Sequence, residues 1–299
     1  MTARAEGPGA AASAWSRSRH RRRPWWLRDT RVAVGVLIVA GIASLAAMAP
    51  YLALRQPTQI DLQQTLERPG PAHPFGTDQL GRDLLSRVVF AGRTSLVVGV
   101  VSVATSLAIG VPLGLVSGYS GGRADLLAMR FVDVLQAFPG LLLAIAVIAI
   151  LGPGILNMML AIGVSASPLF ARLLRASVLE VKGEEFVDAA RATGGTDLRI
   201  MLRHVLPNAL APLIAQSTLR LGSAILTSAS LSFLGLGVQP PQPEWGAMVS
   251  EARQYFVSAP HLIVFPGLAI ILCVLGFNLL GEALSDRIDP RLANASENR

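Results

Sequence analysis

The sequence predicts an all-α polytopic membrane protein with six transmembrane helices. Two observations predict this class. Hydrophobic residues make up 52% of the 299 residues and charged residues only 15%, whereas soluble proteins carry about 25% charged residues. The charges also cluster between long uncharged runs, as in chains that cross a bilayer several times. The net charge of +7 comes from basic residues that flank these runs, so it indicates membrane orientation and not nucleic-acid binding.

Uncharged runs locate the six spans. Val32 to Leu54 carries no charge, and as a helix it would extend about 35 Å, enough for a hydrocarbon core of about 30 Å. The run from Val134 to Ala171 is too long for one span, and Gly152-Pro153-Gly154 predicts a turn that divides it into the third and fourth spans. The second, fifth and sixth spans are expected at Thr94 to Gly122, Ala209 to Leu236 and Leu262 to Gly281.

Positive charge sets the orientation of these spans, because cytoplasmic loops carry more Lys and Arg. Nineteen of the 26 Lys and Arg residues fall on one side, six fall on the other, and Arg220 lies inside a span. Both termini are therefore expected in the cytoplasm. The first apolar run follows three arginines, as in a signal peptide, but it exceeds the usual h-region of about 7–15 residues. Because cleavage would also leave only five spans, we interpret it as an uncleaved first span.

This topology divides the chain into four parts. Residues 1–30 form a basic cytoplasmic tail, which is expected to be disordered and to act as a topological anchor, with contact to anionic lipid headgroups as the alternative. Residues 31–92 hold the first span and an extracytoplasmic segment, residues 93–285 form the transmembrane core, and residues 286–299 form a cytoplasmic tail.

A charged segment, Glu184 to Asn208, interrupts the apolar spans on the cytoplasmic side. A helix is expected from about Arg172 to Thr193, and Gly194-Gly195 ends it because glycine takes the left-handed conformation of a C-cap. Thr196 is a candidate N-cap for a second helix, whose apolar stripe is Leu198, Met201, Leu202 and Val205. Pro207 is expected to stop this helix. The product is a short rigid elbow before the fifth span.

The elbow resembles the EAA loop of ABC-importer permeases. It has Asp188-Ala189-Ala190, three further residues, Gly194, and then His204-Val205-Leu206-Pro207. Three other stretches resemble the peptide/nickel-type branch and its dipeptide or oligopeptide C-type subunits: His73 to Arg87, Leu231 to Val249, and Asp286 to Leu292. The chain departs from the pattern where Asp188 replaces Glu, where His204 replaces an aliphatic residue, and where Ser228 stands at a position that is often acidic.

The resemblance implies an ABC transporter type-1 permease fold over residues 93–285 and import by alternating access. It implies that the elbow docks in a groove of a cytoplasmic ATPase. The docking positions would be Glu185, Asp188, Ala189, Ala190 and Gly194, followed by Leu206 and Pro207. The implied partners are a second homologous permease, two ATPase subunits and an extracytoplasmic substrate-binding protein, in a bacterial cytoplasmic membrane. Peptides are the expected substrates, with nickel or another small solute as the alternative within the branch.

No catalytic residue, metal site or cofactor is expected in this chain. A P-loop requires Gly-x-x-x-x-Gly-Lys followed by Ser or Thr, and the one lysine, Lys182, lies between Val181 and Gly183. ATP and Mg²⁺ are therefore expected in the partner ATPases. Gly118 to Gly122 matches the spacing of a serine nucleophile elbow, but it follows a membrane helix and lacks a nearby His, so we interpret it as a turn. An ion-coupled secondary transporter is the alternative class, although it would favour acidic residues within the spans.

Three further groups of residues are singled out. Gly110, Gly114 and Gly118 have the spacing that lets two membrane helices approach closely. Arg220, together with Ser228, could line a translocation path, because a charge inside a span usually faces a cavity or a partner; a structural ion pair or snorkelling toward a helix end is the alternative. His73, Asp78, Arg82 and Asp83 have poor metal-ligand spacing and predict a hydrogen-bonded outer segment.

Overall fold

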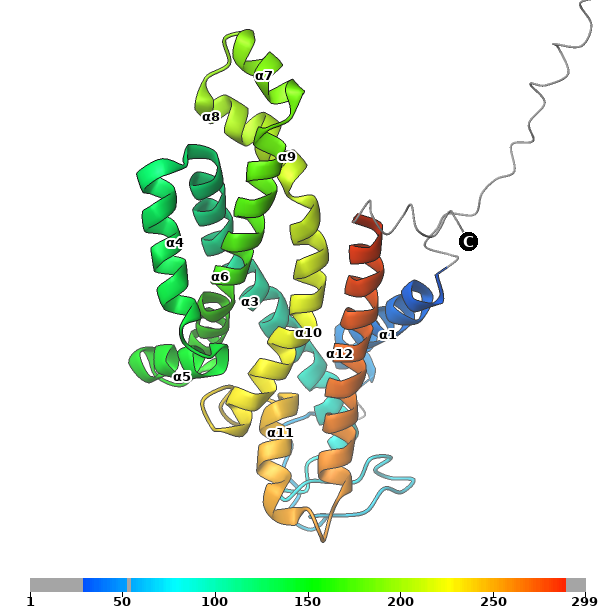
Figure 1. The fold of residues 1–299 in the computed structure, drawn as a ribbon. Coiled ribbons are helices and arrows are strands. Elements are labelled where there is room, and N and C mark those ends of the chain that lie inside the picture. Colours follow the sequence, from blue (N-terminus) through cyan, green and yellow to red (C-terminus); the bar gives the residue numbers. More distant parts are fainter. Residues whose placement is uncertain (1–28, 53–54, 289–299) are drawn as a thin grey trace, which may run out of the picture.

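The computed structural model describes residues 29–52 and 55–288, and these residues are largely helical (Figure 1). Four helices in this part of the chain are long and apolar enough to cross a bilayer. They are α1 (Thr30–Ala47), α3 (Leu84–Ser120), α6 (Ile155–Lys182) and α12 (His261–Ile288). Two bent helix pairs bring the number of spans to the predicted six when each pair is counted once. Most of both predicted tails, and the end of the first predicted span at residues 53–54, lie outside the described residues.

The third span differs most from its predicted form. The sequence places one apolar helix after Val134, but the chain forms α4 (Gly122–Gln136) and α5 (Gly140–Leu151), which meet at 93°. The break falls at Pro139, whose ring disfavours helical geometry in the preceding residue. With 12 residues, α5 is about 18 Å long and cannot cross the bilayer by itself. The predicted break at Gly152-Pro153-Gly154 is present, and α6 begins directly after it.

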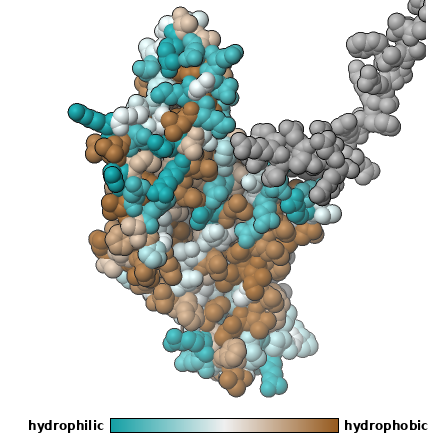
Figure 2. All heavy atoms as spheres, viewed as in Figure 1, coloured by the Kyte–Doolittle hydropathy of each residue, from teal (hydrophilic) through white to brown (hydrophobic). Residues whose placement is uncertain are grey.

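The fifth span is bent as well. It consists of α10 (Ala211–Phe233), preceded at 55° by the short helices between Asp197 and Ala209. Beyond it, α11 (Trp245–Ala252) and a 3₁₀ turn (Arg253–Tyr255) lie at the end of the bundle opposite the elbow, together with the loops that precede α3 (Figure 1). In Figure 2 apolar side chains form a broad band between polar atoms at these two ends, as expected for a protein surrounded by lipid.

The start of α1 lies beside the end of α12. An ion pair joins Arg31 Nη2 to Asp286 Oδ2 at 2.9 Å, and the Asp29 side chain accepts a hydrogen bond from the Arg31 backbone N–H at the start of α1. These two helix ends are therefore on the same side of the membrane. The end of α12 and the elbow also lie toward the same end of the bundle (Figure 1). The cytoplasmic assignment of that side remains a prediction from the distribution of basic residues.

The longest helix, α3, packs along α6 through a row of glycines. A Cβ atom on Gly110 would lie 2.7 Å from the Cβ of Phe170, and one on Gly118 would lie 2.8 Å from the Cβ of Val178. A Cβ on Gly114 would overlap the carbonyl oxygen of Ala171. The three glycines that the sequence singles out therefore form the face of α3 that allows α6 to approach.

Candidate functional sites: the elbow and a cavity between the helices

The elbow is built from four short helical segments. They are α7 (Glu185–Ala192), α8 (Asp197–Ile200), a π-helical turn (Met201–Val205) and α9 (Leu206–Ala209). The first helix predicted here, Arg172 to Thr193, is divided in two, because α6 ends at Lys182 and the chain leaves helical geometry at Glu184 (ψ 145°). The predicted docking positions from Glu185 to Ala190 therefore lie on a separate helix, α7, and not on an extension of the fourth span.

A Schellman motif ends α7 and turns the chain by way of two glycines. The N–H of Gly195 donates to the carbonyl of Ala190 at 3.1 Å, and the N–H of Gly194 donates to Arg191 at 3.0 Å. Gly194 has a φ of +84°, which L-residues with side chains rarely adopt. Gly195 is needed for space, since a Cβ there would lie 2.8 Å from the Ala190 carbonyl oxygen. The two glycines thus fix the angle between α7 and α8 for different reasons.

One predicted detail of the second helix is confirmed and another is wrong. Thr196 is the N-cap residue of α8, as predicted, although its side chain makes no capping hydrogen bond. Pro207 does not stop the helix, because the preceding turn widens: the N–H of Leu206 donates to Met201, five residues earlier. The wider turn makes room for the proline ring, and the Asn208 side chain donates to the His204 carbonyl at 2.6 Å. The true bend follows α9, at Leu210.

Apolar side chains hold the elbow on one face and remain uncovered on the other. Val187, Ile200 and Val205 are fully buried and join the main core cluster of the protein. By contrast, Phe186, Leu198 and Leu202 are 42%, 62% and 49% exposed. Leu198 and Leu202 belong to the stripe that the sequence predicts, so only part of that stripe packs inward. An exposed apolar patch on a rigid, polar segment is typical of a protein-binding surface.

The predicted docking positions lie on the same segment as these exposed apolar side chains. Glu185, Asp188, Ala189 and Gly194 are exposed and Ala190 is half-buried. Asp188 pairs with Arg191 at 2.9 Å on the outer face of α7. Leu206 is half-buried and Pro207 is exposed at the base of the elbow. The structure therefore places exposed carboxylates, an exposed alanine and exposed apolar side chains on one segment, which protrudes from the helix bundle (Figure 1).

The elbow is tied to the end of α3 by residues that the sequence does not single out for this role. The Tyr119 hydroxyl donates to Asp197 Oδ1 at 2.8 Å, and Lys182 Nζ donates to the Tyr119 carbonyl at 2.5 Å. Lys182 Nζ also lies 5.3 Å from the centre of the Tyr119 ring. One tyrosine thus contacts the end of α6 and the first turn of α8. Beside it, Arg175 binds Asp125 through two hydrogen bonds of 2.6 and 2.7 Å, which join α6 to α4.

Arg220 lines a cavity of about 130 Å³ between α3, α5, α6 and α10. The other polar residues of its wall are serines and a threonine: Ser102, Ser106, Ser165, Ser223 and Thr227. Ser228, the other residue that the sequence proposes for a path, does not line this cavity; it is fully buried and its hydroxyl has no partner among the described residues. Arg220 therefore lines the cavity and Ser228 does not, whereas Thr227, the residue before Ser228, does line it.

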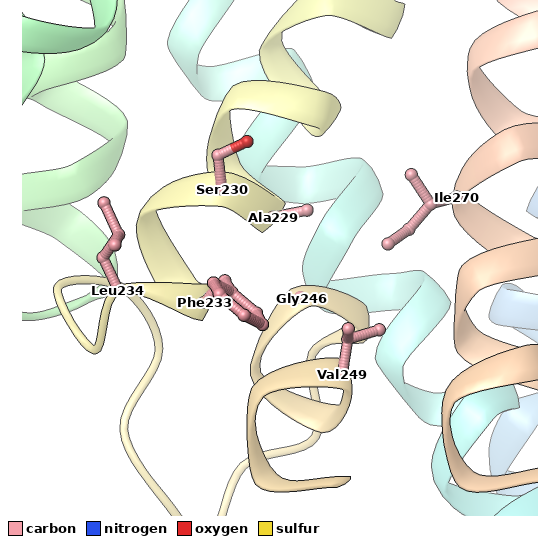
Figure 3. A pocket seen from close by; sticks show the side chains of 7 residues that line it. All are labelled: Ala229, Ser230, Phe233, Leu234, Gly246, Val249 and Ile270. Atoms are coloured by element: carbon pink, nitrogen blue, oxygen red, sulfur yellow. The ribbon is translucent and has the colours of Figure 1, made fainter. Parts of the chain in front are cut away.

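A second recess, of about 320 Å³, lies beside α11 and is almost entirely apolar. Figure 3 shows its lining side chains from the end of α10, from α11 and from α12, with Ile270 pointing toward Ala229. Its one hydroxyl, on Ser230, donates to the Leu226 carbonyl at 3.0 Å within α10. This recess is lined by apolar side chains and by no charged residue, so it differs in chemistry from the cavity at Arg220.

The outer segment before α3 forms a buried polar network. His73 Nδ1 lies 2.8 Å from Asp83 Oδ1, and Asp83 also caps α3 by accepting from the Ser86 N–H at 2.8 Å. The Asp78 carboxylate binds Arg82 at 2.6 Å. The sequence predicts a hydrogen-bonded segment here, and the structure adds its connection to α11: Glu251 accepts from Arg82 at 3.0 Å and from Arg87 at 3.1 Å.

Comparison with known proteins agrees with this arrangement. Residues 110–294 match the family model described as "Binding-protein-dependent transport system inner membrane component". The chain is 46% identical over 259 residues to the dipeptide transport system permease protein DppC of Alkalihalophilus pseudofirmus, covering 87% of this chain and 85% of that protein. It is 46% identical over 279 residues to the glutathione transport system permease protein GsiD of Pectobacterium atrosepticum, covering 91% and 92% of the two chains.

Solved structures share the fold at low sequence identity. The inward-facing MetNI methionine ABC transporter aligns with a TM-score of 0.54 and 22% identity, covering 69% of this chain and 98% of that chain. An amino acid ABC transporter crystallised with histidines aligns with a TM-score of 0.52 and 16% identity, covering 68% and 94%.

Proposed function

Because the chain belongs to the family of binding-protein-dependent transport system inner membrane components, we propose that it is the permease subunit of an ATP-driven importer of peptides. It is a multi-pass protein of the bacterial cytoplasmic membrane. We propose peptides as the substrate because the chain is 46% identical to dipeptide and glutathione permeases over most of each chain. Dipeptides and glutathione are both short peptides, so one chemical class covers the named substrates of these relatives.

The elbow is the proposed coupling surface for a cytoplasmic ATPase. Two kinds of exposed group on the elbow support this role: apolar side chains at Phe186, Leu198 and Leu202, and carboxylates at Glu185 and Asp188. The Schellman motif makes the segment rigid, and the contacts of Tyr119 and Lys182 join it to α3 and α6. A displacement of the elbow would therefore move two membrane helices together, which is what coupling requires.

The remaining partners complete the proposed cycle. A second, homologous permease would form the other wall of the path, two ATPase subunits would bind and hydrolyse ATP with Mg²⁺, and an extracytoplasmic binding protein would deliver the peptide. ATP binding would close the ATPase pair and push the elbows, and the path between the permeases would change its open side. No chemical step is assigned to this chain.

Co-purification from native membranes tests this proposal. The chain is isolated in mild detergent, and its partners are identified by mass spectrometry. We expect a second permease and ATPases with the wild type, and loss of the ATPases with Asp188→Arg, which reverses the charge on the exposed face of α7. Gln59→Arg is the matched control, because it adds the same side chain at an exposed position outside the elbow. If no ATPase is found with the wild type even after crosslinking, the importer proposal fails and an ion-coupled transporter becomes the better reading.

A further inference from the structure

Arg220 is a charge inside the membrane with no counter-charge among the described residues. It is the tenth of the 23 residues of α10, about 14 Å from the start of that helix. It makes no ion pair or hydrogen bond with any described residue. Among the helices that line its cavity, α3, α5 and α10 contain no Asp or Glu, and Glu180 of α6 lies at the end of that helix. Glu282 of α12, a helix that also packs on α10, forms no ion pair with Arg220. A charge at this depth is costly unless something compensates it.

The cavity wall supplies hydrogen-bonding groups of a defined kind. The hydroxyls of Ser106, Ser165 and Thr227 each donate to a carbonyl of their own helix at 2.9 Å. Their protons are therefore used, and their oxygen lone pairs can accept hydrogen bonds from a ligand. The Ser102 hydroxyl is buried and has no partner among the described residues, so it can donate or accept. The cavity thus combines one guanidinium, one free hydroxyl and several acceptors.

This set of groups matches the end of a peptide. A guanidinium binds a carboxylate through two parallel hydrogen bonds, and a carboxylate is the anionic group that every free peptide carries at its C-terminus. The amide N–H that precedes a terminal carboxylate needs an acceptor, which the serine and threonine oxygens provide. A volume of about 130 Å³ is smaller than the about 300–1,000 Å³ of pockets that enclose a whole drug-sized ligand. It can hold the terminal group and not a whole peptide.

We infer that Arg220 and the hydroxyls around it form a subsite for the terminal carboxylate of the peptide during translocation. The inference rests on the proposed function and adds to it the group of the substrate that this chain contacts. A carboxylate of the second permease could satisfy Arg220 in the same way. The two sources differ in their consequences, because a substrate group affects transport whereas a subunit group affects assembly.

The test uses the assembled importer in proteoliposomes, with this chain, its second permease, its ATPases and its binding protein. The probe is radiolabelled alanyl-alanine. The variants are Arg220→Gln, which removes the charge at similar size, and Arg220→Lys, which keeps the charge but loses the two-pronged geometry. Arg93→Gln is the matched control, since Arg93 is an exposed arginine of α3 outside the cavity. Uptake, ATP hydrolysis stimulated by the liganded binding protein, and subunit ratio are measured for each.

We expect Arg220→Gln to lower uptake by about tenfold or more, because the variant loses one charge-assisted contact with the substrate. The stimulated ATP hydrolysis and the subunit ratio should stay at wild-type levels, as should all three readouts of Arg93→Gln. Arg220→Lys should fall between Arg220→Gln and the wild type. Uptake by Arg220→Gln within about twofold of wild type would overturn the inference. So would loss of the second permease from that variant, which would identify a subunit ion pair. If the wild type itself shows no uptake that depends on the binding protein, the proposed function fails first, and this inference fails with it.

Discussion

The Tyr119 hydroxyl donates a hydrogen bond to the Asp197 carboxylate at 2.8 Å, across 78 positions of sequence. This bond joins the C-terminal end of α3 to the first turn of α8 in the elbow. Lys182, at the end of α6, donates a hydrogen bond to the carbonyl of the same tyrosine. The elbow is therefore connected to the bundle on two sides, through the second span and through the fourth.

Tyr119→Phe removes only the hydroxyl and tests whether this bond transmits motion. A hydrogen bond to a charged group is worth about 1.5–3 kcal/mol when buried, and Asp197 is exposed, so we expect a smaller loss of stability. We expect normal recovery of the ATPases and fewer peptides imported per ATP hydrolysed. Tyr255→Phe is the control, at the opposite end of the molecule. An unchanged ratio of import to hydrolysis would show that the bond is not part of the coupling.

Gly194→Val tests the angle of the elbow. Valine at a φ of +84° is strained by about 1–2 kcal/mol, whereas asparagine tolerates this conformation. We therefore expect Gly194→Val to increase hydrogen exchange across α7 and to weaken ATPase recovery, and Gly194→Asn to resemble the wild type. Since a Cβ at this position meets no atom within 4 Å, a difference between the variants reports the backbone and not a clash. Equal behaviour of the two variants would contradict the role of this turn.

The sequence alone was sufficient for the approximate positions of most spans, but not for the start of the third span or for the bent shapes of the third and fifth. Uncharged runs and the Gly152-Pro153-Gly154 break mark where helices cross or end, because charge and backbone geometry act locally. The 93° bend between α4 and α5 depends on packing against α6 as well as on Pro139. Similarly, the exposure of Leu198 and the burial of Ile200, two residues apart, depend on which face of α8 meets the core.

The candidate sites show the same division. The docking positions of the elbow and the isolated charge of Arg220 are visible as patterns along the chain. The arrangements that make them candidate sites join distant segments: Tyr119 donates to Asp197, and Arg220 lines one cavity with serines of α3 and α6. Pairings of this kind follow from the three-dimensional packing of helices, and no spacing rule within one segment predicts them.

Gly114→Leu tests the close approach of α3 and α6. Any side chain on Gly114 overlaps the Ala171 carbonyl, so the helices must separate, at a cost of about 1–3 kcal/mol or more. Gly41→Leu is the matched control, because a Cβ on Gly41 in α1 meets no atom within 4 Å. We expect a clear drop in the thermal midpoint of the purified protein for Gly114→Leu and little change for Gly41→Leu. Similar midpoints for both variants would rule out glycine packing as the main contact.

The buried carboxyl group of Glu244 is expected to make the stability of the protein depend on pH. Burial raises the pKa of its carboxyl above the usual value, although its oxygen accepts from the Ala247 N–H at 2.8 Å to cap α11. A raised folded-state pKa means that the native protein holds its proton more tightly than the unfolded chain. Its contribution to stability is therefore complete at acidic pH and is lost as pH rises from the unfolded value of about 4.5 through the folded pKa.

The Glu244→Gln variant isolates this effect, because glutamine keeps an oxygen for the cap but does not titrate. We expect its thermal midpoint to match the wild type at acidic pH and to exceed it increasingly as pH rises toward 8. Thermal unfolding in detergent across this range measures the difference. A constant gap between the two proteins at all pH values would show that Glu244 does not titrate with a raised pKa.

Glu251 is expected to hold the outer end of the bundle together. It accepts from both Arg82 and Arg87, whose side chains are 4% and 2% exposed, and it connects α11 to α3 and the segment before it. Glu251→Ala would leave two buried arginines with the single carboxylate of Asp78. Breaking a buried ion pair costs about 3–5 kcal/mol, and because Glu251 is itself 23% exposed we expect the lower end of that range.

An exposed ion pair provides the comparison for this variant. Asp133 and Arg172 lie 2.6 Å apart with 47% and 50% of their side chains exposed, and such pairs contribute about 0–1 kcal/mol. Asp133→Ala should therefore leave the thermal midpoint nearly unchanged, whereas Glu251→Ala should lower it strongly. Glu251→Gln, which keeps the acceptor oxygen but not the charge, should fall between them. If the alanine variants at Glu251 and Asp133 behave alike, burial does not strengthen the ion pairs of Glu251. The connection of α11 to α3 must then depend on other contacts, such as those of Trp245, whose indole N–H donates to the Val88 carbonyl at 2.9 Å.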